Sequence, residues 1–226
     1  MRMCGRYSLH TDPARLADRF GVGFEGFQPR YNCAPGQELP VVTDGGLERM
    51  EWGFTPSWAD ESFDLINARA ETVAEKRSFA DAYESRRCLV PATGFYEWAD
   101  RGDGKRPYRV AFEDDRPFAM AGIYERWQPT TRQAGLGEFG ADGESDDEPR
   151  ETFAVLTTEP NELVADLHHR MAVILPPERE TDWLAGADER ALFEPYDDDG
   201  MHAYPVSTAV NSPANDDSSL LDRAEV

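Results

Sequence analysis

The 226-residue sequence is almost without lysine: only Lys76 and Lys105 occur, so arginine carries nearly all of the positive charge. Against 23 basic residues stand 44 acidic ones, which gives a net charge of −21 at pH 7. The acids are spread along the chain, which argues against an acidic interaction tail. Such a surface is typical of a salt-loaded cytoplasm, where carboxylates keep the protein hydrated and salt screens their repulsion. Taken alone, this charge argues against a nucleic-acid partner.

Cysteine and long apolar runs are scarce as well. Cys4, Cys33 and Cys88 are an odd number at wide spacing, with no Cys-x-x-Cys pair and no neighbouring histidines of the kind that bind zinc. No apolar stretch reaches about 18 residues, and the N-terminus lacks the apolar core of a signal peptide. We therefore expect a soluble, cytoplasmic protein without a metal or other cofactor.

Short strands separated by turns rich in Asp and Gly dominate the pattern. The sequence predicts one α+β domain over residues 3–211, with mainly antiparallel, curved strands and short peripheral helices. It also predicts a disordered insertion over 129–151 and a loose polar tail over 212–226. Strands are expected at 4–9, 39–43, 47–54, 87–90, 94–98, 108–112, 118–127, 153–157 and 171–175. Helices are expected at 13–20, 71–83, 160–168 and 176–186, the first capped by Asp12 and ended by Gly21.

Cys4 stands one methionine away from becoming an N-terminal residue. At a free N-terminus its thiol and α-amine would sit on adjacent carbons, and an α-amine, which ordinarily titrates at about pH 7.7 to 8.0, is partly nucleophilic near neutrality. Such a pair can condense with an aldehyde to an imine, which the thiolate closes to a five-membered thiazolidine. The alternative is that Cys4 is a small apolar residue of the first strand.

Ordered motifs elsewhere in the chain bear on this choice. They are CGRY at 4–7, RYNCAPG at 30–36, WGFTPSW at 52–58, INARAE at 66–71, GFYEW at 94–98 and LHHRM at 167–171. In order and identity they resemble the SRAP domain, the SOS response-associated peptidase family, over residues 3 to about 211. The resemblance implies a DNA-damage protein that crosslinks covalently to abasic sites in single-stranded DNA. The open-chain aldehyde of an abasic deoxyribose is the electrophile that an aminothiol captures, so the lesion would be shielded.

Three polar residues of these motifs are predicted to assist Cys4 in catalysis. Glu97 lies between Tyr96 and Trp98 in an otherwise apolar strand, where a free charge is costly, so we interpret it as the acid–base group rather than as a surface glutamate. His168 would assist imine formation and proton transfer, although a histidine at a helix end is ordinarily a cap or solvated. Asn67 would orient the sugar or the terminal amine, or cap a following helix.

Single-stranded DNA is held by aromatic stacking and by cations along its backbone, and arginine suits phosphate because its planar fork donates two hydrogen bonds. The tryptophans could instead belong to the core. The resemblance implies DNA contacts from Arg6, Asn32, Pro35, Trp58, Arg69, Arg77 and Trp98. We expect a monomer that associates with the nucleoid when it engages DNA and that has no membrane partner.

Two other classes of function remain open at this stage. One is a thiol autopeptidase or N-terminal-nucleophile hydrolase in which Cys4 attacks an acyl carbon. The other is a noncovalent single-strand binding module that uses only the groove. The crosslinking protein that the resemblance implies is also compatible with autopeptidase and lyase-type activity.

The aminothiol chemistry predicts that crosslinking requires Cys4 as the first residue. A start at Met1 would leave Arg2 in front after methionine removal, whereas a start at Met3 or self-processing would expose Cys4. Intact-mass measurement on the reactive protein should therefore give a chain that begins at Cys4. A protein that retains Met1 and still crosslinks would contradict the requirement.

Overall fold

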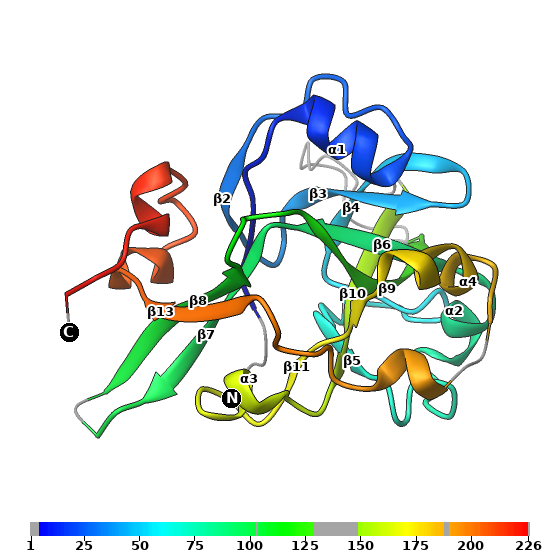
Figure 1. Ribbon diagram of the computed structural model, residues 1–226. Coiled ribbons are helices and arrows are strands. Elements are labelled where there is room, and N and C mark those ends of the chain that lie inside the picture. Colours follow the sequence, from blue (N-terminus) through cyan, green and yellow to red (C-terminus); the bar gives the residue numbers. More distant parts are fainter. Residues whose placement is uncertain (1–4, 103, 129–148, 188–189, 226) are drawn as a thin grey trace, which may run out of the picture.

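Two β-sheets joined by a bent ribbon make up most of the molecule. The structure, a computed structural model, describes residues 5–102, 104–128, 149–187 and 190–225 (Figure 1). The ribbon arises because β6 runs directly into β7 and pairs with β9, while β7 pairs with β8. Mostly antiparallel strands with few short helices confirm the predicted α+β class.

Sheet A has five strands in the order β13-β8-β7-β1-β2, and all of its neighbouring pairs are antiparallel. Within it, β1 pairs with β7, a strand almost ninety positions later in the sequence. The strands are β1 (Tyr7–Leu9), β2 (Arg30–Cys33), β7 (Gly94–Asp100), β8 (Lys105–Phe112) and β13 (Met201–Pro205).

Sheet B has eight strands and closes on itself, because β10 pairs with both β4 and β9. Closure leaves β5 and β11 beside β10 and places β12 against β9. The strands are β3 (Glu38–Thr43), β4 (Gly46–Trp52), β5 (Asn67–Arg69), β6 (Arg87–Ala92), β9 (Phe118–Trp127), β10 (Arg150–Thr158), β11 (Met171–Ala172) and β12 (Ile174–Leu175).

The helices are short and peripheral. In α1, the Asp12 side chain accepts from the backbone N–H of Ala14, Pro13 takes the first position, and Gly21 ends the helix at φ 70°. None of the helices in the described part of the chain is long and apolar enough to cross a bilayer. The α-helices are α1 (Pro13–Phe20), α2 (Ala80–Ser85), α3 (Glu162–Ala165) and α4 (Glu180–Leu184). The 3₁₀ helices are η1 (Pro177–Arg179), η2 (Arg190–Phe193), η3 (Thr208–Asn211) and η4 (Ser218–Leu221).

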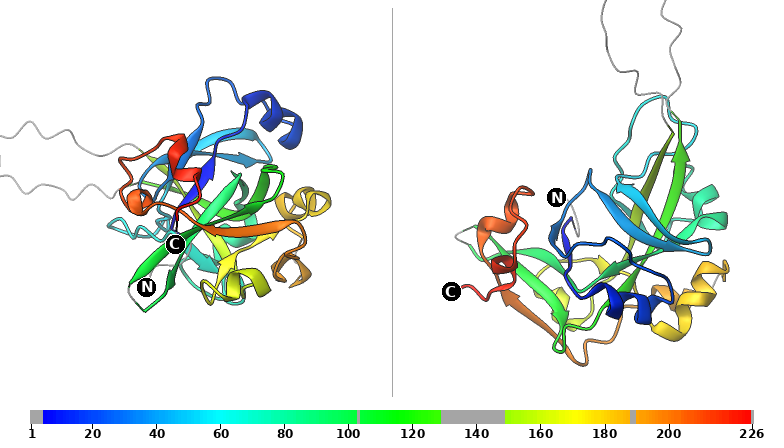
Figure 2. Two further views of the ribbon diagram at one scale, coloured as in Figure 1. Left: turned by 60° about the vertical axis from the view of Figure 1, so that its left-hand side comes forward. Right: turned by 90° about the horizontal axis from the view of Figure 1, so that it is seen from above.

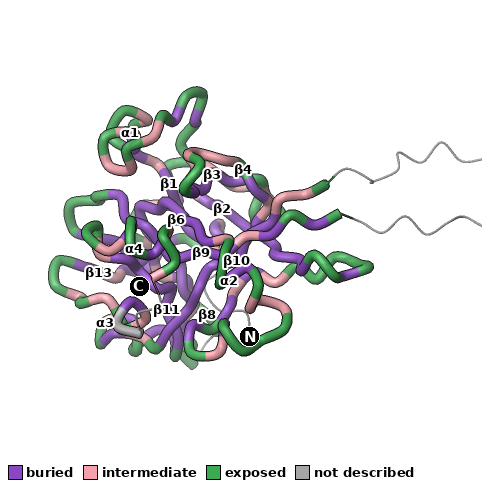
Figure 3. Tube along the Cα trace, turned by 90° about the vertical axis from the view of Figure 1, so that its right-hand side faces the viewer, coloured by how far each residue is buried: buried purple, intermediate pink, exposed green. Residues whose placement is uncertain are grey.

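Trp52, at the end of β4, connects the two sheets inside the core. Its ring lies 5.3 Å from that of Tyr7 on β1 and 6.2 Å from that of Phe153 on β10, centroid to centroid. Its indole N–H donates to the carbonyl of Ile66 at 2.9 Å. The buried residues concentrate on the strands around it, whereas the exposed residues lie mainly on peripheral helices and loops (Figure 3).

Most predicted elements are present, with shifted ends. The hairpin of β3 and β4, the strand β9 and the helix α1 confirm the pattern-based predictions. The predicted helix 71–83 is wrong in its first part: residues 70–75 and 77–79 form turns, and only Ala80–Ser85 is helical. The sequence analysis did not predict β2, β5 or β13. Arg150 and Glu151, assigned to the insertion, belong to β10, and 129–148 lie outside the described residues.

Residues 207–225, called here the C-terminal segment, are anchored across one face of sheet A. η3 packs near β8 and η4 near β2 (Figure 2). Val210 and Leu220 are buried there in a small cluster with Tyr96, Tyr204 and Val206. The predicted loose tail is therefore not seen in residues 212–225.

Polar contacts from sheet A hold the same segment. The Asp216 carboxylate accepts from the backbone N–H groups of Tyr31 at 2.6 Å and Asn32 at 2.9 Å, and it pairs with Arg30. The Tyr204 hydroxyl donates to the carbonyl of Leu221 at 3.0 Å. Composition did not reveal this anchoring because the partners lie far away in the sequence.

We expect Leu220→Ala to lower the free energy of unfolding by about 2 to 4 kcal/mol, since it removes buried methyl groups and leaves a cavity. Urea unfolding would measure the change. Ser218→Ala, at an exposed site of the same 3₁₀ helix, is the matched control and should stay within about 0.5 kcal/mol of the parent. Equal effects of the two variants would show that the segment is not anchored in solution.

Candidate functional site

Sheet A brings three of the motifs together, because β1 lies between β2 and β7. Cys4 itself lies outside the described residues, and the chain that follows it runs along β7. Tyr7 pairs with Phe95, and the carbonyl of Arg6 accepts from the backbone N–H of Tyr96 at 3.0 Å. Antiparallel neighbours run in opposite directions. The chain followed from Tyr7 toward the N-terminus therefore lies beside β7 in the direction of Asp100, the last residue of that strand.

Glu97 lies on this part of β7 and is only 1% exposed. Side chains alternate along a strand. Phe95 belongs to the main core and Tyr96 to the cluster under the C-terminal segment, so Glu97 shares the face of Phe95. Glu97 is not a surface glutamate, and its catalytic role stays a prediction.

Sheet B brings the other two polar motifs together on either side of β10. Asn67 and Arg69 of β5 pair with Val155 and Thr157, and Thr157 also pairs with Ala172 of β11. The segment that follows His168 and the one that holds Asn67 are therefore both neighbours of β10. Because the chain after β5 forms turns and its next helix begins only at Ala80, the alternative that Asn67 caps a following helix is wrong.

His168 follows α3 and is 5% exposed. Its Nδ1 lies 3.2 Å from both the backbone nitrogen and the carbonyl oxygen of Arg170, so either neutral tautomer finds a partner there. Its Nε2 is buried and has no hydrogen-bond partner among the described residues. Burial lowers the pKa of His168 below its usual value, partly opposed by the backbone contact with Arg170. The ring is therefore neutral near pH 7.

Arg170 fixes the loop that carries His168, and the sequence analysis did not single it out. Its guanidinium forms two hydrogen bonds with the Glu71 carboxylate and another with the carbonyl of Thr157. The hydrogen bonds from Arg170 lower the pKa of Glu71. Its place next to two histidines in LHHRM was a signal that could have identified it.

A pocket of about 190 Å³ lies where the two groups of motifs meet. The structure brings Arg6, Pro35 and Trp98 together in one wall with Ile66, the residue before Asn67, while their contact with DNA stays a prediction. Asn211, which the sequence analysis missed, completes the wall and accepts from the indole N–H of Trp98 at 2.8 Å. The pocket is lined by Gly5, Arg6, Pro35, Ile66, Trp98 and Asn211.

Asn32 is not part of this wall, although a place in the groove was predicted for it. It is fully buried, and its side-chain nitrogen lies 3.2, 3.0 and 2.9 Å from the carbonyl oxygens of Val210, Ser212 and Asn215. Asn32 thus holds the C-terminal segment rather than facing solvent.

Trp58 lies on an exposed loop together with a second aromatic residue. Trp58 is 41% and Phe63 is 42% exposed, and their rings meet edge to face at 5.4 Å. The guanidinium of Arg77 lies 4.4 Å from the Trp58 ring centroid. Trp58 is therefore no core residue. Phe63 was missed, and its signal was an aromatic side chain among the polar residues of Glu61–Asp64.

Arg69 is exposed at the end of β5. Trp58, Phe63 and Arg77 form a second exposed group, which offers flat apolar rings and positive charge in a molecule of net charge −21. Such groups suit a ligand that is planar in one part and anionic in another.

The other two cysteines cannot act as nucleophiles. Cys33 and Cys88 are both fully buried. Burial raises the pKa of Cys33 to about 12 and that of Cys88 further, which keeps both as thiols at neutral pH.

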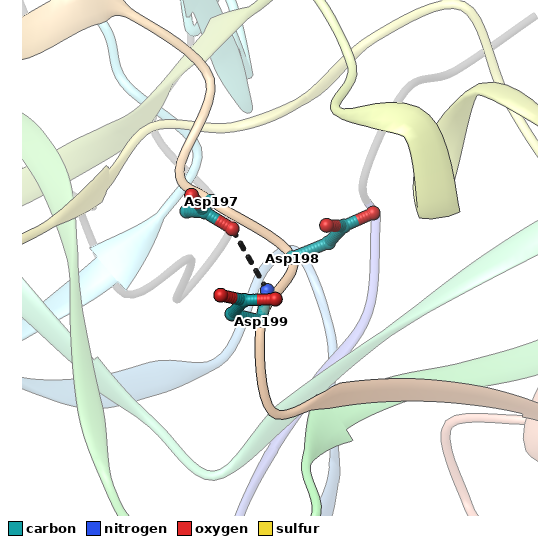
Figure 4. A group of neighbouring side chains, drawn as sticks. All are labelled: Asp197, Asp198 and Asp199. Atoms are coloured by element: carbon teal, nitrogen blue, oxygen red, sulfur yellow. Dashed lines mark hydrogen bonds between the residues drawn. The ribbon is translucent and has the colours of Figure 1, made fainter.

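Asp197, Asp198 and Asp199 are neighbours in the turn before β13 (Figure 4). Asp198 accepts from the backbone N–H of Leu163 at 3.2 Å and Asp197 from that of Asp199 at 2.9 Å. Backbone contacts thus account for two of these carboxylates, and exposed acids of this kind are common without an ion. The cluster carries no metal assignment.

Comparison with known proteins identifies a family and several relatives that this chain resembles. The family model described as "SOS response associated peptidase (SRAP)" matches residues 3–213. Abasic site processing protein YoaM of Bacillus subtilis is 39% identical over 97% of this chain and 98% of its own length. Abasic site processing protein HMCES of Gallus gallus is 32% identical over 95% of this chain and 76% of its own length.

Two further matches agree with these. Abasic site processing protein YedK of Escherichia coli is 30% identical over 85% of this chain and 83% of its own length. A crystal structure of a protein from Bacteroides thetaiotaomicron superposes with a TM-score of 0.82 at 29% identity, covering 98% of this chain and all of that one.

The lowered pKa of His168 has a consequence for stability. Below about pH 6.5 the unfolded chain takes up a proton that the folded protein accepts less readily, so the stability contribution of neutral His168 is lost as the pH falls. We expect His168→Gln to lose less stability than the parent between pH 7 and pH 5. Urea unfolding of both proteins between pH 7 and pH 5 measures this difference. Parallel curves of unfolding free energy against pH would contradict the prediction.

Proposed function

Because the chain belongs to the SOS response associated peptidase (SRAP) family, we propose that it processes abasic sites in single-stranded DNA by capturing the lesion covalently on Cys4. The abasic-site role is supported by the names of the curated relatives. The covalent step is supported above all by one observation. The residues directly after Cys4 lie along β7, so that the chain followed back from Tyr7 to Cys4 leads toward buried Glu97. Two of these residues, Gly5 and Arg6, line a pocket with Trp98.

The chemistry balances without a cofactor. The α-amine of Cys4 adds to the aldehyde carbon of the ring-opened deoxyribose and water leaves, which gives an imine. The thiolate then adds to the imine carbon, and the nitrogen takes up a proton, so a carbon–sulfur bond closes the thiazolidine. Removal of the imine prevents the β-elimination that would break the strand.

Three residues supply the proton transfers and the positioning. Glu97 protonates or deprotonates the sugar oxygens as the ring opens and as water leaves. His168 takes up or releases a proton at Nε2. Both neutral forms of the ring are supported, because Nδ1 can accept from the backbone N–H of Arg170 or donate to its carbonyl. Asn67 orients the sugar or the terminal amine from β5.

The strand is held by aromatic faces and arginines. Trp98, Pro35 and Arg6 contact the nucleotides beside the lesion, and Trp58 with Phe63 offers a second stacking surface. Arg69 and Arg77 pair with phosphates. Phe63 is added to, and Asn32 is removed from, the contacts that the sequence suggested.

The acidic remainder of the molecule repels DNA at low salt. At 1 M salt the Debye length falls to about 3 Å, so only contacts at the site are effective and covalent capture matters more than equilibrium affinity. We propose that the protein works as a monomer in a salt-rich cytoplasm and associates with the nucleoid through this capture.

The test is a denaturing gel of the protein, started at Met3, after incubation in molar KCl with single-stranded DNA that carries one abasic site. We expect a slow band that survives denaturant, requires the abasic site and is absent with Cys4→Ala and Cys4→Ser. Glu97→Gln, which preserves shape, should slow its formation about a hundredfold or more.

The same variants separate the competing activities. A noncovalent module would keep its full DNA association in Cys4→Ala and never give the band. An autopeptidase would process its own N-terminus and lose that in Cys4→Ala, with no dependence on DNA. A folded protein with a verified Cys4 terminus that gives no band would refute the covalent proposal.

A further inference from the structure

We propose that Asn211 is a positioning residue that fixes the indole of Trp98 as a stacking platform for the nucleotide beside the lesion. The inference rests on the proposed function and adds a part of the chain that the motifs do not cover. Asn211 ends η3, in the C-terminal segment, far along the chain from every catalytic candidate.

The contact joins the two residues at the edge of the ring. The Oδ1 of Asn211 accepts from the indole N–H of Trp98 at 2.8 Å, and both residues line the 190 Å³ pocket. A hydrogen bond in the plane of an indole fixes the rotation of the ring without itself covering either face. The backbone carbonyl of Asn211 also accepts from the Arg6 guanidinium at 3.5 Å, which is a weaker contact.

Asn211 can hold Trp98 because it is itself held on both sides. Buried Asn32 on β2 directs its side-chain nitrogen at the carbonyls of Val210 and Ser212, the residues before and after Asn211. The Asn215 side chain donates to the carbonyl of Ala209 at 2.8 Å. The backbone of this turn is therefore fixed to sheet A by a residue of the RYNCAPG motif.

The apolar side of the turn is fixed as well. Val210 is fully buried against Tyr96 and Val206, while Trp98 packs on the edge of the same cluster. Trp98 shares the face of Tyr96 and not that of Glu97, since side chains alternate along β7. Asn211 therefore acts on the platform and not on the proton-transfer group.

A double-mutant cycle with Asn211→Ala and Trp98→Phe isolates this contact, because Trp98→Phe keeps an aromatic ring and removes the N–H. Binding is measured in the Cys4→Ala background by fluorescence anisotropy on an intact single strand, and crosslinking is measured by gel with Cys4 present. Asn211→Ala should weaken binding about three- to tenfold, the ordinary worth of one hydrogen bond. In the Trp98→Phe background it should cause no further loss.

Ser218→Ala, in the same segment and exposed, is the control and should bind as the parent does. Circular dichroism and thermal melting confirm that each variant folds. If Asn211→Ala binds like the parent, or if its effect is undiminished in Trp98→Phe, the positioning role is overturned. If the parent gives no crosslink, the covalent proposal fails, while the binding cycle still decides the role of Asn211.

Discussion

The position of the Trp52 side chain is the constraint on which the site depends. Its ring contacts Tyr7 of sheet A and Phe153 of sheet B, and its N–H holds the carbonyl of Ile66. One buried residue thus fixes the strand that follows Cys4, the closed sheet, and the residue before Asn67. Its burial at 1% exposure means that neither sheet can shift without opening the core. The pocket lies at this junction because its two walls are joined there.

The scarcity of lysine has a structural side as well. Arg109 is 1% exposed and bonds to Tyr204, Thr93 and Asp115, while Arg87 stacks on two aromatic rings and donates to backbone carbonyls. These positions use the several donors and the flat face of guanidinium, which an ammonium group does not have. Arginine thus serves as an internal cross-link at these two positions, while others, such as Arg116 and Arg126, form ion pairs at the surface.

The elements whose signals are local were predictable from the sequence. Asp12, Pro13 and Gly21 marked α1, and the Asp-Gly-Gly turn marked the hairpin of β3 and β4. It could not predict β5 or β13, because three to five residues become strands only through partners distant in sequence. The same reason explains why the first part of the helix expected at 71–83 does not form. The backbone N–H of Ala70 is bonded to the distant carbonyl of Thr157, and a series of turns follows.

Asn32 was placed in the groove for its motif, but its burial depends on the C-terminal segment, whose polar composition gave no sign of packing. The burial of Glu97 was predictable because an acid in an apolar strand is informative without any partner, while its catalytic role stays a prediction.

The lining of the pocket sets an order of assembly. Arg6 and Asn211 are 205 positions apart, yet they meet in one wall. On a ribosome the early residue is made first and must wait until the late one has left the exit tunnel. A growing chain therefore carries Arg6 before the rest of this wall exists. The pocket can be complete only after synthesis has passed residue 211 and that residue has left the tunnel.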